Sequence, residues 1–390
     1  MRQFPASPIT ALIDSEPLYN LGESYAPPLT VTDLLGPDGL ACLGSLKLGY
    51  GTSAGDPSLR ELVAARHGIP DSQVLITAGA AAALFLLALV CGDGQIVIGQ
   101  PCYPPMLDAV RGIGAPIALV RSRFEDGYRL DIGAFARKLT PRTQLVMFAS
   151  PQNPSGVALT DDEVNQMLAA MSRTCPEALL LIDETYREAT YGDRRPAPSF
   201  AGRSPRLLTC ASLSKAYGTP GLRIGWLAIS SPPLFEQIRL AKFNSALSCG
   251  ALDEFLAAAL LAQADRVIAA RGAHMADARS TVEQWIKAHV GQLRWLRPQA
   301  GAFCCLQLDP DTFTREDAVG RFHARLARHQ TLVAQGTWFG DSPLVFRLGL
   351  AYEPADKLRN GLEAISTALK DVSSSEARLA DSTGLRHRAP

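Results

Sequence analysis

Seven short runs of aliphatic and β-branched residues recur between residues 73 and 230, and they constrain the fold more than any other feature of the chain. Most of these runs lack alternating polar positions, which is typical of strands that are covered on both faces. Helix-length segments, such as residues 161–173, separate several of them. The runs are 73–77, 95–98, 116–120, 144–148, 179–182, 207–211 and 225–229. We therefore predict a three-layer α/β sandwich around a mostly parallel seven-stranded sheet.

The pattern changes after Pro232 to long helical periodicity, and from Leu296 onward short strand candidates alternate with two helix candidates. That second mixture is typical of a smaller α+β domain. The stretch from Val372 onward has few apolar residues, so we expect it to lack stable structure. The predicted division is an N-terminal segment that joins the small domain (1–45), a large domain (46–275), a small domain (276–371) and a disordered tail (372–390).

Composition favours small-molecule partners over nucleic acid or membrane. The 390 residues carry 38 basic and 38 acidic side chains, so no net charge attracts polyanions. The longest apolar run, residues 80–91, is shorter than the about 20 residues that a membrane span requires. The N-terminus lacks the apolar core of a secretory signal, and the eight cysteines show no metal-ligand spacing. We expect a cytoplasmic protein without a metal site.

Residues that directly follow the predicted strands are the first candidates for a site, because ligands of open α/β sheets bind beyond the carboxyl ends of the strands. The first strand leads into Gly79, Ala80 and Ala81 at a helix start, where free N–H groups can hold a phosphate. The second leads to Tyr103, an aromatic ring that could stack on a flat heterocycle. Ordinary turn chemistry and core covering are the alternative interpretations of these two segments.

Three later strands end in residues with stronger chemistry. Two prolines extend the segment around Asn153 and direct its amide toward the same edge. Asp183 ends a buried strand, where it is either a functional carboxylate or a helix cap. Lys215 follows another buried strand, a position that lysine occupies only for a reason.

These segments together resemble the class I/II aminotransferases, the fold type I pyridoxal-phosphate-dependent enzymes, over residues 21–369. The most specific part is Ser212-x-Ser-Lys215 followed by Gly-Leu-Arg223-Ile-Gly. Asn-Pro-Ser-Gly after position 152 and Asp-Glu-Thr-Tyr from Asp183 to Tyr186 support it in the family's order.

The resemblance implies a pyridoxal 5′-phosphate cofactor carried as a Schiff base on Lys215, whose freed amine would then move the Cα proton. Asp183 would pair with the pyridine nitrogen, and Asn153 and Tyr186 would donate hydrogen bonds to the ring phenolate oxygen. Tyr103 would stack on the ring. The phosphate would be held by Gly79, Ala80, Ala81, Ser212 and Arg223.

The resemblance also implies how substrate and partner bind. Arg347 would grip the substrate α-carboxylate with two prongs, with Gly22 and Asn153 nearby. Tyr50 is similar to the tyrosine that reaches the phosphate of the neighbouring subunit, which implies a homodimer with shared sites. One departure is an alanine-only phosphate loop, Ala80 to Ala82, which lacks the side-chain donor of many relatives.

Transamination between an L-amino acid and a 2-oxo acid is the leading prediction, since it is the family's commonest outcome. A non-transaminating enzyme is the alternative, performing β- or γ-elimination, replacement or cyclisation, because the segment from Leu213 to Arg223 resembles the subset that includes capreomycidine synthase. A catalytically silent cofactor-binding module is the third hypothesis. The neutral charge and the lack of an appended DNA-binding region count against it.

Overall fold

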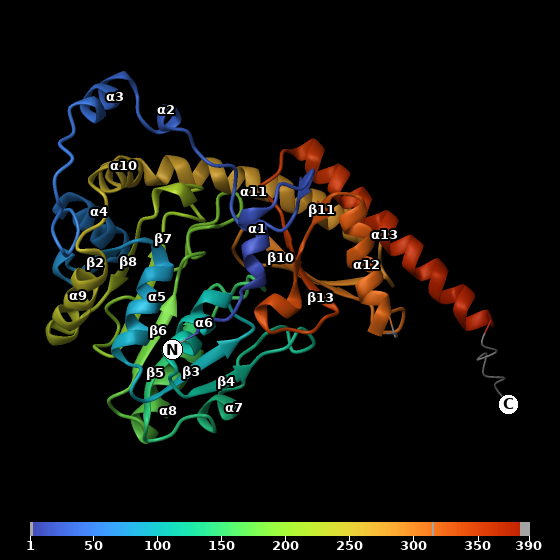
Figure 1. Cartoon of the computed structure of the whole chain (residues 1–390), viewed down its shortest axis with the longest axis horizontal. Coiled ribbons are helices and arrows are strands. Elements are labelled where there is room, and N and C mark those ends of the chain that lie inside the picture. The colour runs from blue at the N-terminus through green and yellow to red at the C-terminus, as the bar shows by residue number, and fades with distance from the viewer. Residues whose placement is uncertain (1–2, 314–315, 383–390) are drawn as a thin grey trace.

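A seven-stranded sheet forms the centre of the larger part of the molecule (Figure 1), in a computed structural model that describes residues 3–313 and 316–382. Its order is β2-β8-β7-β6-β5-β3-β4; β8 runs antiparallel to both of its neighbours, and all other neighbouring pairs are parallel. The strands are β2 (Val74–Thr77), β3 (Gln95–Gln100), β4 (Ile117–Arg121), β5 (Thr143–Ala149), β6 (Leu179–Asp183), β7 (Leu207–Ser212) and β8 (Gly225–Ala228). All seven predicted strands are present.

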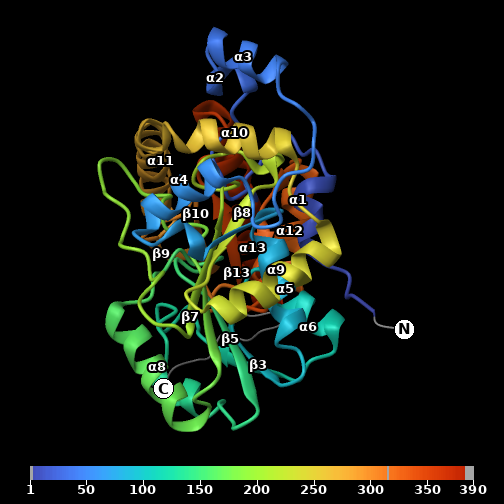
Figure 2. The same cartoon turned by 90° about the vertical axis from the view of Figure 1, so that its left-hand side faces the viewer.

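Helices cover both faces of this sheet. One apolar cluster joins α5 (Gly79–Val90), α6 (Pro104–Ile113) and α9 (Pro232–Ala246) to one face. A second cluster joins α7 (Ile132–Ala136) and α8 (Asp161–Thr174) to the other face. Figure 2 shows α8 on one side of the strands and α5, α6 and α9 on the other. Two helical layers around a mostly parallel sheet confirm the predicted fold class.

A second, antiparallel sheet lies in the C-terminal part, in the order β12-β13-β10-β9. A separate parallel pair joins β1 to β11 and so ties the N-terminal segment to this part. The strands are β1 (Tyr19–Asn20), β9 (Leu293–Leu296), β10 (Phe303–Leu308), β11 (Thr331–Leu332), β12 (Ala334–Gln335) and β13 (Val345–Gly349).

The remaining helices connect and flank the two sheets. The longest connection, α11 (Ala264–Lys287), crosses the top of Figure 1 and packs against α13. Helices α2 and α3 project from the body in both Figure 1 and Figure 2. The other elements are η1 (Pro8–Thr10), α1 (Ala11–Asp14), α2 (Val31–Leu34), α3 (Pro37–Gly44), α4 (Pro57–His67), η2 (Asp71–Gln73), η3 (Pro220–Leu222), α10 (Ala251–Leu261), α12 (Glu316–Arg328), η4 (Gly336–Phe339) and α13 (Ala355–Ser382).

Two details differ from the sequence-based expectations. Helix α13 continues to Ser382 and so passes through the start of the predicted tail at residue 372, because neither proline nor glycine interrupts the chain after Gly361 until Gly384. The rest of that tail, 383–390, lies outside the described residues. The predicted domain boundary between residues 275 and 276 falls inside α11. Over residues 3–313 and 316–382, no helix is long and apolar enough to cross a bilayer.

Candidate active site

A cavity of about 910 Å³ opens where the parallel strands β5, β6 and β7 end. The last residues of these strands, Ala149, Asp183 and Ser212, lie in its wall. Folding brings ten of the predicted site residues to this one cavity. They are Ala80, Ala81, Tyr103, Asn153, Asp183, Tyr186, Ser212, Lys215, Arg223 and Arg347. The cavity lies at the sheet edge where open α/β folds bind ligands.

Lys215 lies in the loop after β7, with its amine inside the cavity. Its Nζ donates a hydrogen bond to the Ser24 hydroxyl over 3.1 Å and lies 5.1 Å from the centre of the Tyr25 ring. Burial lowers the pKa of Lys215 to about 8; Glu23 acts in the opposite direction, and Arg347 and Arg223 act in the same direction. At pH 7 about one-tenth of this amine is therefore unprotonated and nucleophilic, far more than for a lysine with the ordinary pKa of about 10.4.

Asp183 ends β6 and is 6% exposed. One of its oxygens accepts a hydrogen bond from the Thr185 N–H over 2.9 Å. Burial raises the pKa of Asp183, although hydrogen bonds from Thr185 and Cys210 act in the opposite direction. No ion pair joins Asp183 to a cation within the described part of the chain. A carboxylate in this setting is stabilised by a cationic ligand.

Arg347 lies in the middle of β13 and is 1% exposed. Its Nη1 donates to Asn153 Oδ1 over 2.7 Å, and its Nη2 donates to the Gly22 carbonyl over 2.5 Å. Its Nε, also buried, has no hydrogen-bond partner. The structure thus joins three residues that sequence reasoning placed near the substrate. A buried guanidinium that forms no ion pair with a carboxylate of the described residues is suited to hold the carboxylate of a ligand.

Gly79 begins α5 with a φ of +76°, a conformation that glycine adopts without strain. A Cβ at this position would lie 2.5 Å from Arg223 Nη2, so the guanidinium packs directly on the start of the helix. Arg223 Nη1 also donates to the Pro220 carbonyl over 3.0 Å. The first N–H groups of α5 and the guanidinium form a site for a dianion.

Tyr50 does not contribute to the cavity of its own chain. It lies in the loop between α3 and α4 and is 89% exposed, and the nearby Leu48 is 83% exposed. This position leaves the predicted contact with a neighbouring subunit untested.

Sequence reasoning missed Ser24, which lies at the centre of the site. Its hydroxyl accepts hydrogen bonds from Lys215 Nζ and, over 2.9 Å, from the Tyr186 hydroxyl. The expected hydrogen bond from the Tyr186 hydroxyl to the cofactor ring stays a prediction. The family resemblance placed the nearby Gly22 at the substrate but gave the Ser24 hydroxyl no role. The pairing of β1 with β11 is part of what brings the N-terminal segment to the cavity.

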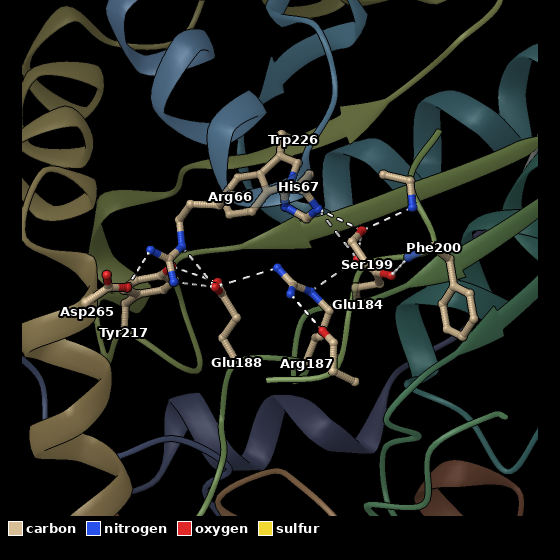
Figure 3. A network of polar contacts seen from close by, with 12 residues as sticks. Arg66, His67, Glu184, Arg187, Glu188, Ser199, Phe200, Tyr217, Trp226 and Asp265 are labelled. Atoms are coloured by element: carbon tan, nitrogen blue, oxygen red, sulfur yellow. Dashed lines mark hydrogen bonds and ion pairs between the residues drawn. The ribbon is translucent and has the colours of Figure 1, made fainter. Parts of the chain in front are cut away.

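A polar network that sequence reasoning also missed is centred on Glu184 and Glu188, which follow Asp183 closely in the chain (Figure 3). Arg66 and Tyr217 both donate to Glu188, and Ser199 and the Phe200 N–H both donate to Glu184. Arg187 lies between the two carboxylates, 3.4 Å from Glu184 and 3.6 Å from Glu188. The network therefore braces the turn that carries Asp183 into the cavity.

His67 is held neutral within this network. The Trp226 Nε1–H donates to His67 Nε2 over 3.0 Å, which requires an acceptor nitrogen there, and His67 Nδ1 faces Ser199 at 2.9 Å. Burial lowers the pKa of His67 to about 3, and Arg187 acts in the same direction. Glu184, 3.6 Å away, would favour the charged ring, but the indole donor and burial outweigh it.

We expect this histidine to make the protein acid-sensitive. The folded pKa lies below the ordinary value of about 6.5, so the stabilisation is complete above pH 6.5 and is lost as pH falls toward 3. Between pH 7 and 4.5 the contribution amounts to about 2–3 kcal/mol. Denaturant unfolding of His67→Gln should show a free energy that falls less steeply over this range. The exposed His329→Gln should keep the wild-type slope; equal slopes for all three proteins would contradict the assignment.

Comparisons with known proteins agree with this geometry. The sequence model of the family described as aminotransferase class I and II matches residues 41–365. Capreomycidine synthase of Streptomyces vinaceus is 31% identical over 330 residues, which cover 84% of this chain and 82% of that protein. Arginine–pyruvate transaminase of Pseudomonas aeruginosa is 28% identical over 347 residues, covering 85% and 86%.

A solved structure of a pyridoxal-phosphate-dependent aminotransferase from Streptococcus suis shares the fold, with a TM-score of 0.81, 24% identity and coverage of 91% of this chain and 94% of that one. The predicted family is therefore confirmed by a match over most of the chain. The chain belongs to the class I and II aminotransferases and is a pyridoxal-phosphate-dependent enzyme.

Proposed function

We propose that this enzyme transfers the amino group of an L-amino acid to a 2-oxo acid, with pyridoxal 5′-phosphate bound covalently to Lys215. The observation that carries the proposal is the buried Lys215 amine, with its pKa lowered to about 8, in a cavity shared with Asp183 and Arg347. When bound, the cofactor supplies an electron sink for the bond that breaks at the substrate Cα.

The cavity offers a partner for each polar part of the cofactor. Asp183, a buried carboxylate without an ion pair, would keep the pyridine nitrogen protonated. The start of α5 at Gly79 and the Arg223 guanidinium would hold the phosphate, and Ser212 lies in the same wall. Tyr103, also in the wall, would cover the ring face. The unpaired buried groups fit this ligand.

Substrate handling would fall to three residues. Arg347 would take the α-carboxylate with the guanidinium edge that includes its unpartnered Nε. Lys215, once displaced by the substrate amine, would remove the Cα proton and deliver it to the cofactor carbon. The Ser24 hydroxyl, 3.1 Å from the Lys215 amine, would hold that amine in position between these steps.

We also propose a homodimer in which Tyr50 completes the partner's site. Tyr50, Leu48 and Leu40 lie in or beside the projecting α2–α3 segment, and their side chains are exposed. A tyrosine that is 89% exposed on such a segment has little to stabilise it within its own chain. Sedimentation of the purified protein tests this proposal, and a monomer at micromolar concentration would contradict it.

The proposed reaction is tested by following the cofactor spectrum of the purified enzyme with a panel of L-amino acids, and then with pyruvate or 2-oxoglutarate. We expect the amino acid to convert the cofactor to its amine form, and the 2-oxo acid to restore the aldehyde. A cofactor that stays an aldehyde while ammonia or a cyclic product accumulates would favour elimination or cyclisation instead. Failure of any amino acid to exchange its α-proton with deuterium would favour a silent site.

Replacing Arg347 by methionine should raise KM by about 100-fold for amino acids with a free α-carboxylate, because the variant keeps the side-chain length but loses a buried charge partner. The corresponding amines, which lack the carboxylate, should be affected much less. Initial rates with norleucine and pentylamine measure the difference. An equal rise in KM for both compounds would remove the proposed role, and melting temperatures control for loss of folding.

A further inference from the structure

Most charged side chains inside the cavity have a partner of opposite charge, either another residue or a group of the proposed cofactor or substrate. One carboxylate inside the cavity has none among the described residues. Lys357 lies 3.9 Å from Glu353, and both line the cavity. The proposed function assigns Asp183, Lys215 and Arg223 to the cofactor and Arg347 to the substrate carboxylate. Of the acidic residues in the wall, this leaves Glu16, which is exposed at the rim, and Glu23, which is buried.

Glu23 is 8% exposed and takes part in no ion pair within the described residues. Its only hydrogen bond to the described chain comes from the N–H of the next residue, Ser24, over 3.3 Å to Oε2. Its charge acts on the Lys215 and Arg347 cations and on the Tyr25 and Tyr352 hydroxyls, so the carboxylate lies near these four side chains. A buried carboxylate without a dedicated cation is costly unless a ligand supplies one.

Two aromatic rings border the same region. The rings of Tyr25 and Tyr352 lie 5.2 Å apart in an edge-to-face arrangement, and both residues line the cavity. The face of Tyr25 already has a cation near it, Lys215 Nζ at 5.1 Å. A carboxylate beside two phenol rings is a setting in which ammonium and guanidinium groups are bound through ion pairing and cation–π attraction.

The position of Glu23 relative to Arg347 determines whether one bound amino acid can contact both side chains. Glu23 directly follows Gly22, whose carbonyl accepts a hydrogen bond from Arg347. The α-carboxylate site and the unpaired carboxylate thus belong to adjacent parts of one segment, within reach of the two ends of one bound amino acid. Arg347 would face the α-carboxylate, and Glu23 would remain for the side chain.

We propose that Glu23, with Tyr25 and Tyr352, selects amino acids whose side chain ends in an ammonium or guanidinium group. This inference rests on the proposed function and adds the class of its substrate. Basic amino acids would bring into the cavity the cation that Glu23 lacks, and neutral analogues would leave the carboxylate buried and unpaired.

The test uses two pairs of amino acids that differ in the terminal charge: L-arginine with L-citrulline, and L-lysine with L-norleucine. The rate of cofactor conversion is measured for the holoenzyme and for Glu23→Gln, an isosteric change that removes the charge. We expect kcat/KM to favour the basic member of at least one pair by about 100-fold in the wild type. The preference should fall below about tenfold in Glu23→Gln, while conversion of the neutral member stays within a few-fold of the wild type.

Glu16→Gln is the matched control, since it removes a carboxylate from the exposed rim of the same cavity; it should keep the preference. A wild-type enzyme that converts both members of each pair equally would overturn the inference while leaving transamination intact. So would a Glu23→Gln enzyme that retains the preference, or one that loses the neutral substrates as well. Absence of conversion with every amino acid would instead contradict the proposed function itself.

Discussion

Lys215→Ala is expected to lower kcat by at least about 10³-fold, because the change removes both the nucleophilic amine that anchors the cofactor and the base that moves the Cα proton. The Lys215 amine lies in the cavity wall, and burial lowers its pKa to about 8. Steady-state rates with the preferred amino acid measure the loss. Absorption spectra should show that added cofactor binds as the free aldehyde.

A second lysine of the same cavity provides the control. Lys357→Ala removes an amine that is paired with Glu353, and we expect its turnover and its visible spectrum to stay within a few-fold of the wild type. Wild-type turnover by Lys215→Ala would refute the assignment. Equal losses in both variants would contradict a role that is specific to Lys215.

Asp183→Asn is expected to slow conversion of the cofactor by about 100-fold or more and to weaken cofactor binding. The amide keeps the shape of the carboxylate but cannot stabilise a positive charge on the ring nitrogen, on which the electron sink depends. Asp183 is buried and has no ion pair of its own in the described chain, so its charge is available for a ligand. Single-turnover absorbance measurements report the rate directly.

The neighbouring carboxylate distinguishes catalysis from folding. Glu184 is also buried, but it accepts from Ser199 and from the Phe200 N–H (Figure 3), and it does not line the cavity as Asp183 does. Glu184→Gln should therefore lower the free energy of unfolding by about 1–3 kcal/mol while leaving single-turnover rates nearly unchanged. An Asp183→Asn protein that is only less stable, with a wild-type rate, would support a capping role for Asp183 instead.

The sequence predicted the large sheet well because its strands are buried on both faces. Runs such as 179–182 are apolar throughout, so each run predicts a strand from its own residues, without information about the strands that pair with it. The two-residue strand β1 has no such signal, since it forms only by pairing with β11, more than 300 positions away. The tail after Val372 was assigned by composition, which ignored that an established helix continues until something stops it.

The site residues also fall into those that a local pattern predicts and those that only long-range contacts bring to the cavity. Lys215, Asp183 and Asn153 could be predicted because each follows a strand, and parallel strands end at one edge. Ser24 could not, because its contacts with Tyr186 and Lys215 span 162 and 191 positions and follow no local pattern. The cluster from Glu184 to Glu188 could be read as charged, but not as a buried network closed by Arg66 and Tyr217.

The central claim is that the cofactor is joined to the amine of Lys215. Borohydride reduction of the native enzyme, followed by digestion and mass spectrometry of the labelled peptides, tests it most directly. We expect one reduced pyridoxyl group, on the peptide that contains position 215. A label on any other lysine, or no label on an enzyme that turns over amino acids, would contradict it.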